Sequence, residues 1–142
     1  MKNNITILVR AVVQKEGKIL VCRKIGKKYY FFPGGHVECG EDTKDALERE
    51  IKEELGRRIK KCKFVGGSEH IFTDDGRKHH EINLAFEVRL DNLQKIASKE
   101  DHLCFFWLTE KELDKEKVLP ACLTKAVIKW RSNKRPFWTS RI

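Results

Sequence analysis

Three glutamates fall close together on one face of a predicted helix: Glu50, Glu53 and Glu54. The second and third follow the first by three and four positions, and at about 100° per residue all three lie within an arc of about 100°. Like charges packed this closely repel one another, so a helix gains nothing from them unless a cation lies between them. Hard divalent cations such as Mg²⁺ take oxygen ligands and bind phosphate-bearing substrates. The spacing therefore predicts a site for a divalent metal.

The residues before this cluster extend the pattern. Residues 34–57 read GGHVECGEDTKDALEREIKEELGR, in which a glycine and a glutamate precede the cluster at fixed distances. This pattern resembles the Nudix box, the signature of the Nudix hydrolases, and a merely solvated acidic helix face would not need those upstream residues. Arg57 departs from the box because it replaces an apolar residue. The matching positions are Gly35, Glu41, Arg49, Glu50, Ile51, Glu53, Glu54 and Gly56.

The resemblance implies a reaction and a cofactor. Nudix hydrolases bind a divalent metal on this loop-helix-loop signature and hydrolyse a diphosphate linked to another group, so we expect Mg²⁺, with Mn²⁺ as an alternative. A metal suits this reaction because it neutralises charge on the phosphate oxygens and activates water. The implied metal ligands are the backbone carbonyl of Gly35 and the carboxylates of Glu50, Glu53 and Glu54, and these glutamates with Arg49 form the implied catalytic group.

Two positions of the box have implied supporting roles. Arg49 resembles the family arginine that orients the catalytic glutamates through ion pairs, and an ordinary ion pair on the helix surface is the alternative. Glu41 is expected to anchor the loop rather than to catalyse. The general base stays open, because family members place it either on a signature glutamate or on an acidic residue in a later loop. The later candidates here are Glu100 and Asp101, which could equally form a surface turn.

Histidines and aromatic residues are candidates for substrate binding. His36 follows the signature glycine and can approach a phosphate, and His80 lies at the start of a predicted strand whose alternate side chains can point into a pocket. The residues that could stack on a nucleobase are Tyr29, Phe31, Phe72 and Trp107. Aromatic residues in strands more often pack in a core. The sequence shows no second motif that identifies the group attached to the diphosphate.

The elements that position these residues can be predicted from hydropathy and turn residues. Thr43 can cap the signature helix, whose apolar stripe is formed by Leu47, Ile51 and Leu55, and Gly56 can terminate it. Thr109 and Glu112 resemble a capping box that opens a short helix. A terminal helix is expected at residues 121–131, and strands at residues 5–13, 19–22, 29–32, 64–73, 81–90 and 105–108.

This order of elements indicates an α/β fold with a mixed sheet between helices. The resemblance implies the Nudix-type α/β/α sandwich. Pro33 is expected to end the aromatic strand at residues 29–32, and Gly34-Gly35 to form a loop facing the glutamates. The tail at residues 132–142 could cover an edge, contact a partner or stay mobile.

Length and composition favour one domain over residues 1–142. The chain is 40% hydrophobic and 36% charged, which suits a globular protein with a heavily charged surface. No run approaches the ~20 apolar residues needed to cross a bilayer, and Arg10 interrupts the apolar run near the N-terminus. We therefore expect a cytoplasmic protein without a membrane partner. The five cysteines include no CxxC pair, so a disulfide framework or a zinc site is not expected.

The charge distribution leaves three functional classes. The formal net charge is +9 although the signature is acidic, so a basic surface surrounds it that can attract polyanionic phosphates. A Mg²⁺-dependent pyrophosphohydrolase acting on a nucleoside diphosphate derivative is the leading interpretation. A hydrolase of RNA 5′ ends is the second, since basic surface also suits nucleic acid. The third is a nucleotide-binding module without catalysis, against which the three glutamates argue. The oligomeric state cannot be read from the sequence.

Overall fold

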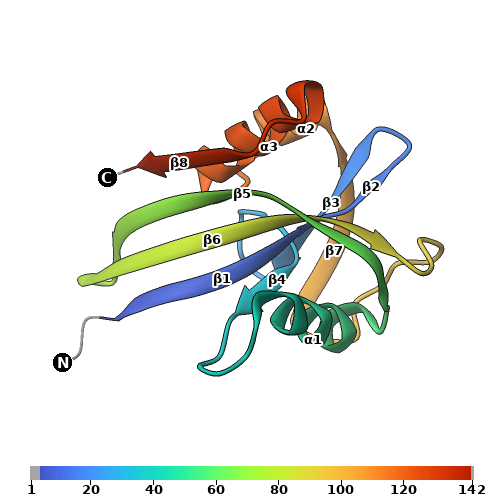
Figure 1. Ribbon diagram of the computed structural model, residues 1–142, viewed down its shortest axis with the longest axis horizontal. Helices are drawn as coiled ribbons and strands as arrows, with labels where there is room; N and C mark the ends of the chain where they lie inside the picture. The colour runs from blue at the N-terminus through green and yellow to red at the C-terminus, as the bar shows by residue number, and fades with distance from the viewer. Residues whose placement is uncertain (1–3, 142) are drawn as a thin grey trace.

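The computed structural model describes residues 4–141, which form a five-stranded and a three-stranded sheet (Figure 1). The larger sheet has the order β4-β1-β6-β5-β8 and the smaller one the order β2-β3-β7. In the larger sheet β1 is parallel to β6 and β5 is parallel to β8, while the other neighbours are antiparallel. The strands are β1 (Ile5–Val12), β2 (Gln14–Lys15), β3 (Lys18–Lys24), β4 (Gly34–His36), β5 (Ile59–Asp74), β6 (Arg77–Leu90), β7 (Leu103–Thr109) and β8 (Phe137–Arg141). The predicted mixed sheet is confirmed.

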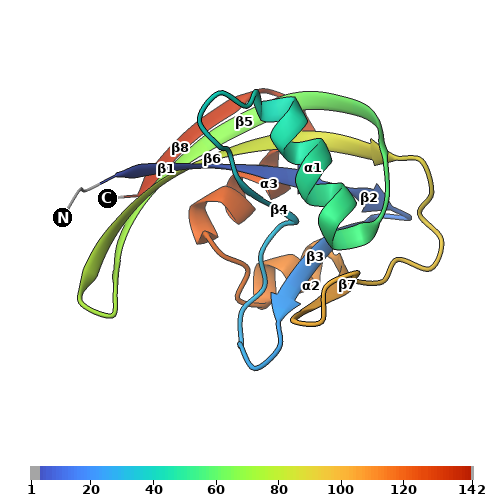
Figure 2. The same ribbon diagram turned by 90° about the horizontal axis from the view of Figure 1, so that it is seen from below.

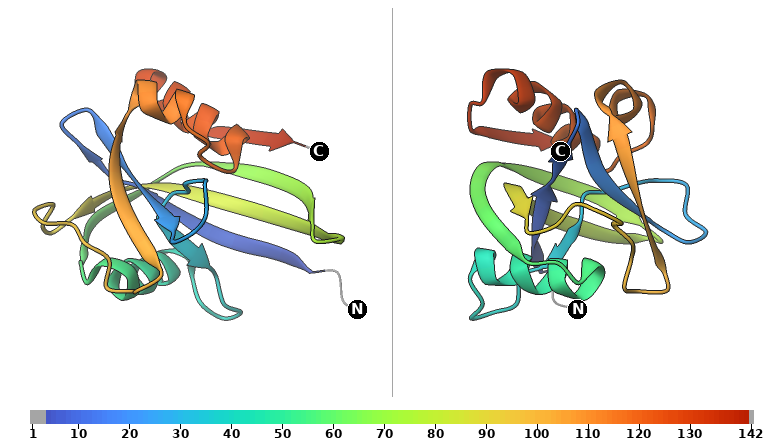
Figure 3. Two further views of the ribbon diagram at one scale, coloured as in Figure 1. Left: turned by 180° about the vertical axis from the view of Figure 1, so that it is seen from behind. Right: turned by 90° about the vertical axis from the view of Figure 1, so that its right-hand side faces the viewer.

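Helices cover both faces of the larger sheet. The helix α1 (Thr43–Leu55) crosses one face, and α3 (Ala121–Asn133), preceded by α2 (Glu110–Lys115), lies on the other (Figures 1 and 2). Strand side chains point alternately to the two faces of the sheet and form two hydrophobic clusters. Val9 and Phe86 pack with α1, whereas Val12 and Ala85 pack with α3. The side view in Figure 3 shows the resulting layers of helix, sheet and helix. This is the expected α/β/α sandwich.

The signature helix begins one residue earlier than expected. Asp42, not Thr43, is the N-cap, and its Oδ1 accepts from the Asp45 backbone N–H at 2.9 Å. Gly56 ends the helix as predicted, with a left-handed φ of 65° that glycine adopts without steric cost. Leu47, Ile51 and Leu55 are all buried. The helix is therefore held on the sheet by its predicted apolar stripe.

The prediction of an aromatic strand at residues 29–32 is wrong. Tyr30 and Phe31 make only isolated bridges, to Val118 and Cys22 respectively. Successive residues bond to different partners on different sides, so no continuous ladder forms. The strand of this region is β4 instead, which follows Pro33 and pairs with β1 through Gly34–His36. The glycines thus lie on a sheet edge rather than in a free loop.

The C-terminal segment adds a strand that the sequence left open. β8 pairs in parallel with β5, with Gly66 opposite Phe137 and Gly67 opposite Trp138. A Cβ on Gly66 would lie 2.5 Å from the Phe137 ring, and one on Gly67 would lie 2.9 Å from the Trp138 ring. The two glycines therefore let the aromatic side chains lie directly on β5, and the tail covers the edge of that strand.

The hairpin of β5 and β6 is longer than predicted and extends beyond both helices (Figure 1). Its turn lies at Asp75-Gly76. On β1, Ile5 and Ile7 are 56% and 42% exposed because they lie beyond the part of the sheet that α1 covers. Among the described residues, no helix is long and apolar enough to cross a membrane.

Candidate metal and diphosphate site

Two residues of the signature, Gly35 and Glu50, are in direct contact. Gly35 lies on β4 and Glu50 on α1, and a Cβ on Gly35 would come within 2.5 Å of the Glu50 carboxyl carbon. At Gly34 a Cβ would overlap the Val9 carbonyl, and the φ of 141° there also favours glycine. Only glycine at these two positions leaves the β4 backbone open to the Glu50 carboxylate.

Arg49 connects the loop before α1 to this carboxylate. Its Nε and Nη2 donate to the two Glu41 oxygens at 2.8 and 3.0 Å, and its Nη1 donates to Glu50 Oε1 at 3.0 Å. Nη2 also donates to the His36 carbonyl at 3.0 Å. The hydrogen bonds from Arg49 lower the pKa of Glu41 to about 2, and the same contact raises the pKa of Arg49. Glu41 thus lies where a loop anchor is expected, and Arg49 lies where it can orient Glu50.

Glu54 is a buried carboxyl with an unused oxygen. It is 5% exposed, and its Oε2 has no hydrogen-bond partner in the described part of the chain. Burial, together with the charge of the neighbouring Glu50, raises the pKa of Glu54 to about 8, although Arg10 and the Gly34 backbone N–H act in the opposite direction. An unpartnered buried carboxyl is costly, and a bound cation would satisfy it.

Glu53 is more exposed than the other two glutamates. Its side chain is 52% exposed and its Oε2 lies 3.7 Å from Arg49 Nη1, on the solvent side of the helix. Consistent with this, the structure gathers no group of three His, Cys, Asp or Glu side chains for a metal within residues 4–141. The structure therefore brings Glu50 and Glu54 together beside Gly34 and Gly35, and leaves Glu53 at the rim.

These groups fit a hard divalent cation. Glu50 and Glu54 offer carboxylate oxygens, one of them unpaired among the residues described, beside a β4 backbone that bears no side chain. Carboxylate and carbonyl oxygens are the donors that Mg²⁺ and Mn²⁺ prefer. Nudix hydrolases generally use a divalent metal, and the donor set of this chain suits one.

Arg10 is a site residue that sequence reasoning missed. Its Nε donates to Asn83 Oδ1 and its Nη1 to the Phe32 carbonyl, both at 3.0 Å, and its Cζ lies 5.6 Å from the centre of the Phe31 ring. Burial lowers the pKa of Arg10, and the nearby Glu54 counteracts this. The signal in the sequence is a lone arginine in an apolar strand.

Asn83 fixes the position of this arginine. It is fully buried between β1 and β5, and its Oδ1 must face the arginine because guanidinium only donates. Its Nδ2 has no partner among the residues that the structure describes. A buried polar group of this kind, adjacent to Arg10, is a second feature that hydropathy analysis does not reveal.

The two later acidic candidates differ in position. Glu100 lies close enough to Glu54 to raise the pKa of that carboxyl, and its Oε2 lies 3.1 Å from His102 Nε2. Its loop is tied to α1, because the Lys99 backbone N–H donates to the Glu54 carbonyl at 2.7 Å. Asp101 is exposed. The structure thus places Glu100, rather than Asp101, near the signature helix.

The predicted substrate contacts are dispersed. Phe31 lies against Arg10, and the His36 side chain is exposed while its carbonyl binds Arg49. His80 Nε2 lies 2.8 Å from Glu69 Oε2 on the long hairpin. The remaining aromatic candidates are a half-buried Tyr29, Phe72 in a stack with His70 and His79, and Trp107 beneath Lys15.

Comparisons with known proteins identify the family of this chain. Residues 2–128 match the family model of the NUDIX domain. An ADP-ribose pyrophosphatase of Methanocaldococcus jannaschii is 35% identical over 83 residues, which cover 56% of this chain and 48% of that protein. The nucleoside triphosphatase NudI of Escherichia fergusonii is 30% identical over 121 residues, which cover 75% of this chain and 83% of that protein.

A solved structure shows the same fold. The MutT protein from Methanosarcina mazei superposes with a TM-score of 0.69 at 21% sequence identity, covering 95% of this chain and 99% of that one. The matched region of the family model contains α1, β4 and the Arg49–Glu41 contact described above. The chain therefore belongs to the NUDIX domain family and is a Nudix hydrolase.

Proposed function

We propose that this chain, acting as one domain over residues 1–142, hydrolyses the diphosphate linkage of a nucleoside diphosphate derivative. The observation that carries the proposal is the convergence of Glu50 and Glu54 on the glycines of β4, with one Glu54 oxygen unpartnered within the described residues. The names of the relatives support this substrate class, because one is an ADP-ribose pyrophosphatase and another a nucleoside triphosphatase.

Mg²⁺ is the proposed cofactor, with Mn²⁺ as a substitute. Glu50, Glu54 and the Gly35 carbonyl are the groups that would hold it, and Glu53 would join them only by turning away from Arg49. The metal supplies a Lewis acid that neutralises charge on the diphosphate oxygens. On the protein side, Arg49 would keep the Glu50 carboxylate against β4 through its 3.0 Å hydrogen bond.

Two other side chains have proposed roles around this centre. Arg10 has two of its nitrogens fixed by Asn83 and Phe32, so its guanidinium is held in place near Glu54 and can face a phosphate oxygen. Glu100 is the proposed general base of the later loop, because it lies near Glu54 whereas Asp101 is exposed. Neither role requires a change in the β4–α1 contact.

Glutamine substitutions at Glu50 and Glu54 test the proposal. Each substitution keeps the shape of the side chain but removes the charge that would hold the metal, so we expect kcat to fall by on the order of 10²-fold or more. Substrates for the assay are ADP-ribose and nucleoside triphosphates with Mg²⁺ or Mn²⁺, and released nucleotide, phosphate and pyrophosphate are measured by chromatography. Circular dichroism establishes that each variant is folded.

Glu48→Gln is the matched control, since Glu48 is an exposed glutamate of the same helix. It should keep wild-type activity. Full activity in Glu50→Gln and Glu54→Gln would refute the proposed centre. If no diphosphate in the panel is hydrolysed by the wild-type protein, the proposed substrate class is wrong.

A further inference from the structure

A groove with three free cations lies where β5 begins, outside the proposed centre. It has a volume of about 730 Å³, which is the size of many ligand sites. The exposed side chains of Lys61, Lys63 and Arg89 line it, together with the half-buried Leu93 and with the core residues Val13, Val88 and Leu90, which are buried. We call this feature the basic groove.

The basic groove exists because two strands separate. β1 pairs with β6 as far as Val12 and Glu87, and then turns into β2 of the other sheet. β6 continues to Leu90 with β5 as its neighbour on one side. The space left between β6 and the β1–β2 junction is the groove, so its walls are rigid strands on both sides.

The cations of the basic groove have an unfavourable arrangement. Lys61 lies directly opposite Arg89 in the antiparallel register, next to an irregularity between Ile59 and Lys61. Like charges directly opposite one another destabilise a sheet. Lys61, Lys63 and Arg89 are all exposed, and they make no ion pair with any residue that the structure describes. An anion between them would remove this repulsion.

The acidic residue in the lining does not compensate these charges. Glu87 lies opposite Lys63 in the register, but its Oε2 accepts from Gln14 Nε2 at 3.2 Å and lies 4.0 Å from Lys134 Nζ. Its charge is therefore shared with the other side of the groove. The net field over Lys61, Lys63 and Arg89 remains positive.

Arg57, the departure from the signature, anchors a loop at the border of the basic groove. Its Nε donates to the Asn92 carbonyl at 3.2 Å, and its Nη2 donates to the Gln94 and Lys95 carbonyls at 2.8 and 3.4 Å. These contacts hold the loop that places Leu93 in the lining. An apolar residue at this position could not bind three carbonyls. The substitution that is unusual for the signature is thus explained by the groove.

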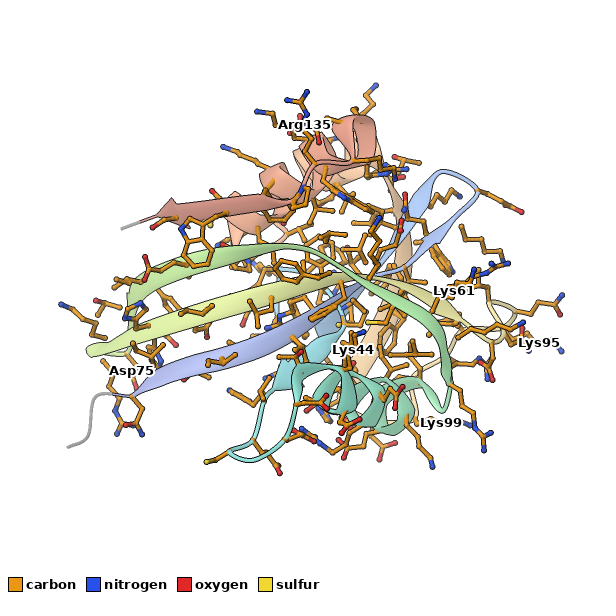
Figure 4. The ribbon with its side chains drawn as sticks, in the orientation of Figure 1. Lys44, Lys61, Asp75, Lys95, Lys99 and Arg135 are labelled. Atoms are coloured by element: carbon orange, nitrogen blue, oxygen red, sulfur yellow. The ribbon has the colours of Figure 1, made fainter. Side chains whose placement is uncertain are left out.

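We infer that the basic groove binds single-stranded nucleic acid. Phosphates would lie on Lys61, Lys63 and Arg89, and a base would pack on the half-buried side chain of Leu93. A chain of phosphates fits better than one small anion because the positive charge continues outside the groove. Residues 57–63 contain five Lys or Arg and no acidic residue, and Lys95 and Lys99 project from the same end of the molecule as Lys61 (Figure 4). Binding at this place is separate from hydrolysis at Glu50 and Glu54.

The test is a titration of a fluorescent single-stranded RNA of about 12 nucleotides, a length suited to a groove of this kind. Anisotropy is measured in EDTA at salt concentrations from about 0.05 to about 0.2 M. The variant Lys61→Gln/Lys63→Gln/Arg89→Gln should bind at least about tenfold more weakly at the lowest salt, and its salt slope should be smaller by about 2, as expected for three lost phosphate contacts. Its kcat on small nucleotides, measured at saturation, should be unchanged.

The control variant, Lys111→Gln/Lys115→Gln/Lys125→Gln, removes the same charge from α2 and α3. It should bind RNA within about twofold of wild type. Equal weakening in both variants, no weakening in the groove variant, or no binding by the wild-type protein at the lowest salt would each overturn the inference. Displacement of the RNA by a free mononucleotide at equal concentration would also overturn it, in favour of a small-molecule site. Hydrolysis is measured separately, so these outcomes leave the proposed function untouched.

Discussion

Arg49 shows how one side chain can prepare a centre before any ligand binds. It contacts both oxygens of Glu41 and one oxygen of Glu50, which joins the signature loop to the helix. A bidentate contact between arginine and carboxylate fixes direction as well as distance. The Glu50 carboxylate is therefore oriented by a neighbour whose own position depends on Glu41, and loss of the Glu41 charge should loosen this arrangement.

Glu41 should make the stability of the protein depend on pH in the acid range. Its pKa is about 2 in the folded protein instead of the ordinary 4.5, because Arg49 stabilises the charged form. A lowered pKa contributes stability above the ordinary value, and this contribution is lost as the pH falls from 4.5 toward 2. In thermal unfolding, Glu41→Gln should therefore have a lower Tm than wild type at neutral pH, and the difference should narrow as the pH falls through this range. Glu48→Gln is the control. A difference that stays constant with pH would contradict this role of Glu41.

Glu100 and Asp101 are adjacent carboxyls that the structure separates by position. Glu100 lies near Glu54, whereas Asp101 is exposed. If Glu100 accepts the proton of the attacking water, Glu100→Gln should lower kcat by about 10²-fold with little change in KM. Asp101→Asn, which makes the same change one residue away, should leave both constants unaffected. Steady-state kinetics on the best substrate of the panel measures this, and equal losses in the two variants would exclude Glu100 as the base.

At the scale of elements, the sequence predicted those parts whose pattern is local. The α1 helix could be predicted because its apolar stripe and Gly56 act within the helix, and the β5–β6 turn because Asp75-Gly76 has a strong local preference. The prediction that Thr43 caps this helix was wrong. Asp42 and Thr43 are both residues that cap helices well, and the local sequence does not decide between them.

The parts that could not be predicted depend on distant partners. Residues 29–32 have the composition of a strand, but Tyr30 bonds to the segment near Val118 while Phe31 bonds to Cys22. β8 forms because Gly66 and Gly67, about 70 residues earlier in the chain, leave space for its aromatic side chains. No local pattern contains such information.

The candidate site likewise combines features that the local sequence predicts with features that depend on distant residues. The helical spacing placed Glu50, Glu53 and Glu54 on one face, and the structure buries Glu54 there, at 5% exposed. The greater exposure of Glu53 could not be read from the spacing, because Arg49 lies near both carboxylates while the Glu50 side chain is 16% exposed and that of Glu53 52%. Arg10 was missed for a related reason, since its partners Asn83 and Phe32 are far away in the sequence.

At the scale of the whole molecule, positive and negative charge are separated. The net charge is +9, yet the carboxylates of α1 converge on β4, and the uncompensated cations gather where β5 begins. The electrostatic field of this positive surface attracts anionic substrates before they contact the protein. The basic surface would then assist the hydrolase in addition to any nucleic acid that it holds.

The field should make turnover of anionic nucleotides sensitive to ionic strength. Raising the salt concentration from about 0.05 to about 0.2 M shortens the screening length to about 7 Å, so kcat/KM should fall several-fold while kcat, measured at saturation, changes little. The Lys111→Gln/Lys115→Gln/Lys125→Gln variant lowers the net charge without altering the proposed centre, so its kcat/KM should start lower and depend less on salt. Salt dependence identical to that of wild type would show that the distributed charge has no part in substrate capture, and that the positive surface serves the basic groove alone.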